Sequence, residues 1–247
     1  MRLLLLNANT SDFVTTKVAA QARRWARAGT EIVPATASFG ARIIATRTEL
    51  AIAEHATLDA LAHHAPGCDA VVLAVSYDTA LRAAREMLHI PVVGITEAAL
   101  FNACLLGTRV GVVMFSRRVL PLYQELARLH GIDSRIAAWR ALESTAPYGD
   151  GDQSDVDRLV VDACLDMVER EGCEAIVLAG AVMAGVPPRL QAQVPVPLLE
   201  GVSCAVAQAE ALVHLGAPKA TRGSLAALPA RELTGVSPAL AARFGPT

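Results

Sequence analysis

Short polar side chains follow several apolar runs of this sequence, at positions where they could do chemistry. The set comprises Asn9, Ser11, Ser76, Tyr77, Asp78, Ser116 and Glu200. Serine hydroxyls and an asparagine amide can hydrogen-bond a small carboxylate or carbonyl group. A tyrosine hydroxyl can donate to a developing enolate oxygen, and a buried carboxylate can act as a general base. Because the same residue types cap helices and form turns, each has a structural alternative.

The charged residues add further candidates. Asp78 and Glu200 are the candidate general bases, and helix capping is the alternative for both. Arg42, which follows the loop around Gly40, can pair with an anionic substrate or lie free on the surface. The histidines are expected on helices or at helix ends, away from the strand ends, as surface or packing residues: His55, His63, His64, His89, His130 and His214.

An internal duplication organises the elements that must position these side chains. Residues 67–78 begin Gly-Cys-Asp and continue as an apolar run, and residues 172–181 repeat the pattern 105 positions later. Two further pairs keep nearly this offset in the same order, 90–93 with 196–199 and 2–6 with 109–113. Unbroken apolar runs are typical of strands buried on both faces. The repeats therefore indicate two similar halves.

Strands and helices are expected to alternate along both halves, which predicts mostly parallel sheets. Besides the two repeated runs, the expected strands are 3–6, 31–33, 91–95, 110–115, 135–141 and 197–199. The expected helices are one from a Ser11 cap to about 28, 48–63, 80–88, 117–129, one behind a Ser154 cap, 188–193 and 203–215. Residues 144–153 are expected to form a long loop, and the tail from 216 an irregular segment that packs back on the first half.

We expect two pseudo-symmetric, Rossmann-like α/β domains with one cleft between them. The first domain is discontinuous, 1–99 plus 206–247, and the second is 100–205. Ligands of parallel sheets bind beyond the carboxyl ends of the strands. The residues expected to line the cleft and bind a substrate are Asn9, Ser11, Arg42, Val75, Ser76, Phe115, Ser116, Gly180, Ala181 and Val182. Ser76, Tyr77, Asp78 and Glu200 are the catalytic candidates.

Composition limits the classes of partner. The net charge of −2 gives no reason to expect nucleic acid or an acidic membrane surface. No apolar run reaches the roughly 18 residues of a membrane span. The five cysteines have neither metal-ligand nor disulfide spacing. We therefore expect a reduced, cytoplasmic protein without a metal site. A homo-oligomer without a cofactor, with a small molecule as its partner, is expected as well.

The order of these stretches resembles the hydantoin racemase family of the aspartate/glutamate racemase superfamily. Residues 7–11, Asn-Ala-Asn-Thr-Ser, are close to the family's opening Asn-Pro-Asn-Thr-Ser. Further stretches fit its two catalytic loops and their surroundings: 69–74, Asp78, 83–86, 91–99, 175–178 and 200–202. Glu97 matches a family glutamate and is expected to face the cleft. The resemblance covers nearly the whole chain and implies the aspartate/glutamate racemase fold.

The resemblance fails at the two residues that matter most for racemisation. Such racemases use two facing cysteines, one in each catalytic loop, to remove and return the α-proton. The matching positions here are Val75 and Gly180, which carry no titratable atom. Cys68 and Cys173 do not substitute, because each lies about seven residues earlier, roughly 23 Å along an extended strand. The two-thiol mechanism is therefore not expected.

We expect a cofactor-independent enzyme of the racemase/isomerase line, acting at the activated α-carbon of a small carboxylate or hydantoin-like substrate by enolate stabilisation. A lyase, such as a decarboxylase, or a hydrolase on the same scaffold is one alternative. A non-catalytic small-molecule binding protein that kept the cleft is the other. A buried carboxylate with a raised pKa near Ser76 and Ser116 would favour an enzyme, whereas a closed, apolar cleft would favour the binding protein.

Overall fold

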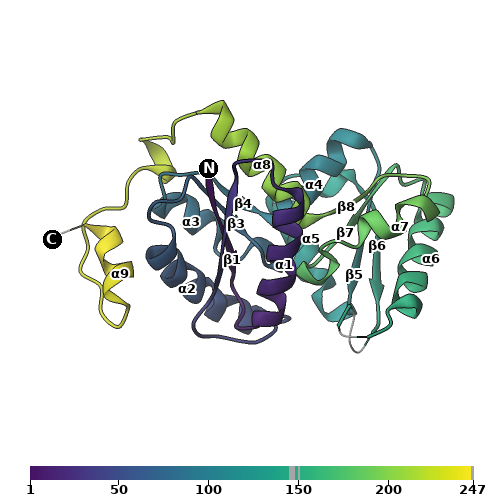
Figure 1. Ribbon diagram of the computed structural model, residues 1–247, viewed down its shortest axis with the longest axis horizontal. Coiled ribbons are helices and arrows are strands. Elements are labelled where there is room, and N and C mark those ends of the chain that lie inside the picture. Colours follow the sequence, from purple (N-terminus) through teal and green to yellow (C-terminus); the bar gives the residue numbers. More distant parts are fainter. Residues whose placement is uncertain (145–147, 150, 246–247) are drawn as a thin grey trace.

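Strands and helices alternate through both halves of the computed structural model (Figure 1), which describes residues 1–144, 148–149 and 151–245. In the first half, with η marking 3-10 helices, the elements are β1 (Arg2–Asn7), α1 (Asp12–Trp25), β2 (Glu31–Thr36), α2 (Arg47–His64), β3 (Ala70–Leu73), η1 (Ser76–Asp78), α3 (Leu81–Met87), β4 (Val92–Gly94) and α4 (Ile95–Leu106). In the second half they are β5 (Val110–Phe115), η2 (Arg117–Val119), α5 (Leu120–Leu129), η3 (Asp133–Arg135), β6 (Ile136–Leu142), α6 (Ser154–Glu171), β7 (Ala175–Leu178), η4 (Ala181–Met183), α7 (Pro187–Leu190), η5 (Gln191–Gln193) and β8 (Leu198–Glu200). Then follow α8 (Gly201–Leu215), η6 (Gly223–Leu225), α9 (Pro238–Ala241) and η7 (Ala242–Phe244).

Each half forms its own four-stranded sheet. The strand order is β2-β1-β3-β4 in the first and β6-β5-β7-β8 in the second, and neighbouring strands run parallel in both. The central strands match in register, since Leu3 pairs with Ala70 and Val110 pairs with Ala175. Two separate sheets with the same order confirm the prediction of two similar α/β halves.

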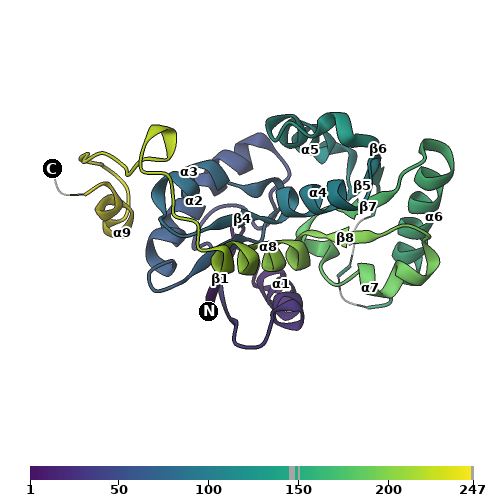
Figure 2. The ribbon, with the colours of Figure 1, turned by 90° about the horizontal axis from the view of Figure 1, so that it is seen from above.

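Helices cover both faces of the first sheet because its central strands have no polar face. All four residues of β3 are buried, and Leu3 to Leu6 of β1 are fully buried. Figure 2 shows α1 and α8 on one side of this sheet and α2 and α3 on the other. Helix α8 therefore completes the first half although it follows the second half in the sequence.

Helix α4 was not predicted from the sequence. Its residues Ile95 to Leu100 are all buried, so its hydrophobic residues do not repeat on one face only. The burial arises because α4 lies between the halves and packs against α8. The two helices approach closely at Gly201, where a β-carbon would lie 2.6 Å from the carbonyl oxygen of Ile95.

The predicted cap of α6 differs in the structure, and the predicted loop before this helix is only partly described. Ser154 does not cap α6, because it is the helix's first residue and its N–H donates to Asp152 Oδ1 at 2.9 Å. Part of the loop expected over 144–153 falls on residues 145–147 and 150, which lie outside the described residues.

The tail contains short helical turns and packs on the first half. Leu240 is buried in the cluster that includes β1 and α2, and the Arg243 guanidinium donates to the carbonyl oxygen of Ala62 at 2.9 Å. This packing supports a discontinuous first domain, whose limits of 1–99 plus 206–247 stay a prediction. Among the described residues, no helix is long and apolar enough to cross a membrane.

The contact at Gly201 gives a stability prediction. Gly201→Ala should destabilise the fold by about 1–3 kcal/mol, because the added methyl group would overlap backbone atoms of Ile95 rather than a flexible side chain. Urea unfolding measures the change. The control is Ala207→Ser on the exposed part of α8, which should stay within about 0.5 kcal/mol of the parent chain. Equal stability of all three proteins would contradict the close packing of α4 on α8.

Candidate functional site between the two halves

The loops that follow β3 and β7 meet between the two halves. A β-carbon built on Gly180 would lie 3.8 Å from Ser76 Oγ and 3.6 Å from the hydroxyl oxygen of Tyr123. Gly180 has a φ of +114°, which residues with a side chain rarely adopt. The missing side chain at Gly180 therefore leaves two hydroxyl groups, one from each half, at the meeting point of the loops.

Tyr123 is a site residue that sequence reasoning missed. It lies on the buried face of α5, and its ring centroid is 4.9 Å from that of Tyr77. Burial raises the pKa of Tyr123, and a hydrogen bond with the Ser76 side chain opposes part of that rise. The hydroxyl therefore stays protonated and can donate a hydrogen bond. The available signal was a tyrosine among leucines on a buried helix face, a position that also suits plain packing.

The loop after β3 has an unusual backbone. Tyr77, Asp78 and Ala80 have φ angles of 67°, 49° and 60°, in the left-handed region. For residues with a side chain, each costs roughly 1–2 kcal/mol. The structure around the loop must therefore hold it in this shape, and strain of this kind clusters at functional sites.

The Asp78 carboxylate supplies one such restraint. Its Oδ1 accepts from the N–H of Thr96 at 2.8 Å, and its Oδ2 accepts from the N–H of Glu97 at 2.7 Å. Asp78 thereby caps the N-terminus of α4 from outside the helix. Gly94 makes the room, because a β-carbon there would lie 2.7 Å from the β-carbon of Asp78.

Glu200, at the end of β8 in the second half, caps the matching helix, α8. Its carboxylate accepts from the N–H groups of Val202 at 2.7 Å and Ser203 at 2.8 Å. Burial raises the pKa of Glu200, and these hydrogen bonds oppose the rise. Both candidate general bases thus adopt the capping alternative in this geometry, and their catalytic roles stay predictions.

The prediction that His130 lies away from the strand ends is wrong. Its side chain is only 10% exposed, with Nε2 3.9 Å from Asp78 Oδ2 and Nδ1 3.8 Å from Glu97 Oε2. Arg85 binds the same Glu97 carboxylate, with one contact of 3.2 Å. His130 reaches this cluster because α5 of the second half packs against the loop of the first. Sequence position alone gives no sign of that contact.

Asn9 and Ser11 form a turn at the end of β1. Asn9 Oδ1 accepts from the N–H of Ser11 at 2.9 Å and from the Asn7 side chain at 2.8 Å. This is the turn alternative for Asn9, and it leaves only the Asn9 amide nitrogen for a ligand. Ser11 occupies the N-cap position of α1, as predicted, although its hydroxyl makes no capping hydrogen bond.

Ser76, after β3, and Ser116, after β5, have different hydrogen-bond partners. The Ser116 hydroxyl accepts from the N–H of Arg118 at 3.3 Å and so caps η2. The Ser76 hydroxyl makes no capping bond and interacts with Tyr123 instead. The capping alternative therefore holds for Ser116 and not for Ser76, and the substrate-binding role of both serines stays a prediction.

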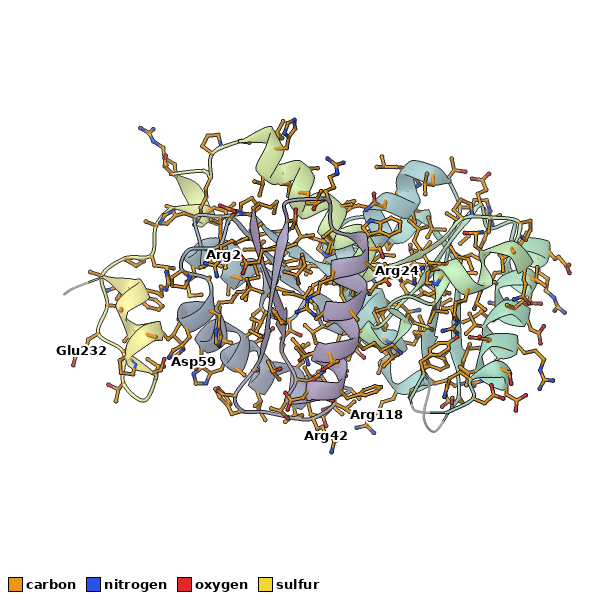
Figure 3. All side chains as sticks on the ribbon, in the orientation of Figure 1. Arg2, Arg24, Arg42, Asp59, Arg118 and Glu232 are labelled. Carbon is orange, nitrogen blue, oxygen red and sulfur yellow. The ribbon has the colours of Figure 1, made fainter. Side chains whose placement is uncertain are left out.

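The remaining candidates lie around this centre. Val75 and Ala181 are buried, and Val182 is half-buried. Phe115 contacts Tyr148 within the second half. The backbone oxygen of Tyr148 accepts from Lys17 of α1 at 2.9 Å, which links the two halves. Figure 3 shows Arg42 exposed at the lower edge of the molecule, the edge toward which β1 runs.

Comparison with known proteins identifies the family of this chain. The sequence profile described as Asp/Glu/Hydantoin racemase matches residues 3–209. The chain belongs to the Asp/Glu/hydantoin racemase family. A hydantoin racemase of Paenarthrobacter aurescens is 30% identical over 218 residues, covering 87% of this chain and 92% of that protein. The chain is therefore related to enzymes of the racemase family.

Two solved structures share the fold. An allantoin racemase from Klebsiella pneumoniae superposes with a TM-score of 0.90 and 32% identity, covering 95% of this chain and 96% of that one. An arylmalonate decarboxylase superposes with a TM-score of 0.63 at 16% identity, covering 88% of this chain and 94% of that one, which shows a common fold only. The expected aspartate/glutamate racemase fold is confirmed.

The buried carboxylate of Glu200 gives a prediction for stability against pH. A carboxyl group whose folded-state pKa is raised stabilises the fold when protonated, and this contribution is lost as the pH rises through the folded-state pKa. Glu200→Gln, which cannot ionise, should therefore gain stability relative to the parent chain between about pH 4 and pH 7. Urea unfolding of both proteins across this range measures the difference. A difference that is constant or falls with pH would show that burial does not raise this pKa.

Proposed function

We propose that this chain is an isomerase of its family that exchanges the hydrogen on a carbon next to a carbonyl group in a small hydantoin-like ring, such as allantoin. The observation that carries the proposal is the pair of hydroxyls, from Ser76 and Tyr123, beside the empty side-chain position of Gly180. The relatives named hydantoin racemase and allantoin racemase support the substrate class. A small carboxylate that carries an activated α-hydrogen is a second substrate class for the same chemistry.

In the proposed reaction the hydroxyls act as hydrogen-bond donors. Removing the hydrogen next to a carbonyl group places negative charge on the carbonyl oxygen, which then becomes an enolate. Two donors fixed in advance at that oxygen stabilise the charge, and one donor of this kind contributes about 10²–10³ in rate. Because burial raises the pKa of Tyr123, its hydroxyl remains a donor through the neutral pH range.

Proton removal in this proposal falls to a solvent base, water or hydroxide. Val75 and Gly180 stand where the resemblance to the family implies thiols, and neither can carry a proton. Neutral hydroxyls are poor bases, and the carboxylates of Asp78 and Glu200 both hold helix N–H groups. The enzyme is proposed to work without a cofactor.

An exchange assay in heavy water tests the proposal. One enantiomer of allantoin should lose optical rotation and gain deuterium faster with the protein than without it. The rate should rise steadily from about pH 6 to pH 9 as hydroxide increases, without the fall at high or low pH that a pair of protein acid and base groups produces. Mass spectrometry and polarimetry on the same samples separate exchange from racemisation.

Variants of the two hydroxyls complete this test. Tyr123→Phe and Ser76→Ala should each slow exchange, by about 100-fold for Tyr123→Phe. The matched control is Tyr148→Phe, which removes the hydroxyl of another tyrosine at the contact between the two halves. This variant should catalyse exchange at the parent rate. If neither Tyr123→Phe nor Ser76→Ala slows exchange, the proposed site is wrong.

Restoring thiols tests the assignment of the two loop positions. Val75→Cys with Gly180→Cys should increase exchange and change its pH dependence to that of thiol groups, while each single variant should racemise far more weakly. The φ of +114° at Gly180 predicts that the added side chain costs about 1–2 kcal/mol of stability, so thermal melts accompany the assay. A folded double variant with unchanged exchange across several hydantoins would place the reacting carbon elsewhere.

A decarboxylase is the second candidate function. The observation that favours it is that Ser76 and Tyr123 can give a proton but are unsuited to take one. Loss of carbon dioxide from a malonate generates an enolate without a base, and a hydroxyl could then protonate it. Carbon dioxide release from an arylmalonate, with no exchange of allantoin hydrogen, would favour this candidate over the isomerase.

The proposed enzyme is a cytoplasmic homo-oligomer. Three exposed apolar side chains, Trp25, Leu105 and Leu106, surround a groove of about 460 Å³ that also contains Leu199 and Cys204. Such a surface is typical of a contact between subunits. Light scattering coupled to size-exclusion chromatography measures the state of the chain in solution.

A further inference from the structure

Two cations from different halves lie beside the ring of Tyr148. The Lys17 ammonium, from α1, is 5.3 Å from the ring centroid, and the central guanidinium carbon of Arg189, from α7, is 5.5 Å from it. The face of an aromatic ring attracts cations but carries no net charge. The ring therefore holds two positive groups near each other without neutralising either of them.

Among the described residues, only Arg189 of these two cations has a carboxylate partner. Its guanidinium contacts Asp157 Oδ1 at 2.5 Å. The Lys17 ammonium instead donates to the backbone oxygen of Tyr148 at 2.9 Å. Burial lowers the pKa of Lys17, and the charge of Arg189 lowers it further. An anion beside the ammonium would offset both effects, because it would stabilise the charge that burial and Arg189 disfavour.

Lys17 keeps hydrogen-bonding capacity for such an anion. An ammonium has three N–H groups, and its contacts among the described residues use one of them, on Tyr148. The residue is half-buried, so solvent and small solutes still reach part of it. The Tyr148 hydroxyl takes no part in this arrangement, because Lys17 contacts the ring and the backbone oxygen of that residue.

Strand β5 places this arrangement near Gly180. The ring centroid of Phe115, the last residue of β5, is 5.9 Å from that of Tyr148. Two residues earlier, the backbone oxygen of Val113 accepts from the N–H of Ala179 at 2.8 Å. Adjacent strands lie about 4.8 Å apart. Phe115 therefore lies beside the part of the chain that leads into Gly180.

Helix α1 brings Lys17 to the same region from the first half. About one turn further along this helix, Gln21 Oε1 is 3.0 Å from the position of a β-carbon on Gly185, in the turn that follows η4. The loop after β7 thus has Gly180 and its neighbouring hydroxyls at its start and α1 against its end. A ligand whose ring lies at those hydroxyls can extend a substituent along the loop toward the Lys17 ammonium.

We propose that the Lys17 ammonium binds a carboxylate at the end of the substrate's ring substituent, and so gives the enzyme a preference for acidic hydantoins such as hydantoin-5-acetate. The inference rests on the proposed isomerase function and narrows its substrate class, since the substituent of allantoin is neutral. Asp157 already balances the charge of Arg189, so Lys17 is the cation that selects the anion. A hydrogen bond between two charged groups is stronger than one between neutral groups, which makes the charge of the substituent the property that is recognised.

Calorimetric titration with hydantoin-5-acetate and hydantoin-5-acetamide tests this preference. The two probes have nearly the same shape, but only the acetate carries a negative charge at neutral pH. The parent chain should bind the acetate at least about tenfold more tightly, which is what a hydrogen bond to a charged group typically contributes. Equal affinity for the two probes, or no binding of either, would overturn the proposal.

Three variants identify the group responsible. Lys17→Met removes the charge and keeps an apolar stem, so it should bind both probes with the affinity that the parent chain has for the acetamide. Lys17→Arg should retain the preference for the acetate. The matched control is Arg24→Met, which removes a positive charge from an exposed position about two turns further along α1 (Figure 3) and should bind both probes like the parent chain. A Lys17→Met chain that still prefers the acetate, or that loses affinity for both probes alike, would overturn the proposal.

Hydrogen exchange measured on the same compounds separates the role of Lys17 from the proposed reaction. Lys17→Met should raise KM for hydantoin-5-acetate about tenfold with little change in kcat, because the carboxylate lies away from the reacting carbon. If allantoin exchanges but the acetate has no advantage in binding, the role of Lys17 is wrong and the proposed reaction stands. If the acetate binds through Lys17 but neither compound exchanges its hydrogen, the proposed reaction is wrong and the binding role of Lys17 stands.

Discussion

The carboxylate of Asp78 is the contact on which the arrangement between the halves depends. A carboxylate at a helix N-terminus satisfies free N–H groups and is favoured by the helix dipole. Here it also fixes three left-handed residues in the loop that presents Ser76, and it lies against His130 from the other half. Its position requires the absence of a side chain at Gly94. One side chain therefore ties the site loop, helix α4 and the second half together.

The two halves cap the helix that follows the last strand of each sheet in different ways. Glu200 caps α8 from the end of its own strand, whereas α4 is capped by a residue of the preceding loop. The residue types in the loops have also diverged while the conformation is kept, since Ala80 adopts a φ of 60° at the position where the repeat has Gly185, with a φ of 79°. The duplicated backbone has kept its shape while the side chains at its ends have changed. This division explains why the fold follows the family closely although the resemblance to its site is incomplete.

Local patterns in the sequence predicted most of the fold. Apolar runs predicted the central strands, and their repetition predicted two sheets. Helix α4 was not predicted because Ile95 to Leu100, at its start, are all buried, so no alternation of apolar and polar residues marks a helical period there. The partners of Tyr123 and His130 could not be predicted for another reason. Each depends on how α5 packs on the loop after β3, about 50 residues earlier in the sequence. The sequence indicated that Asp78 is a carboxylate at a strand end, but not which helix it caps, because α4 begins only after the next strand, β4.

The position of α8 has a consequence for how the chain folds during synthesis. The Gln21 side chain bonds Ser203 at 2.8 Å, although the two residues are 182 positions apart. The sheet of β1 to β4 is made first, yet one of its faces is covered partly by α1 and partly by α8, a helix that leaves the ribosome after β8. The later sheet has its own helices close in sequence and can assemble without waiting. The first-made half is thus completed last, and the apolar residues under α8 stay uncovered in the interval, when association with other chains is favoured.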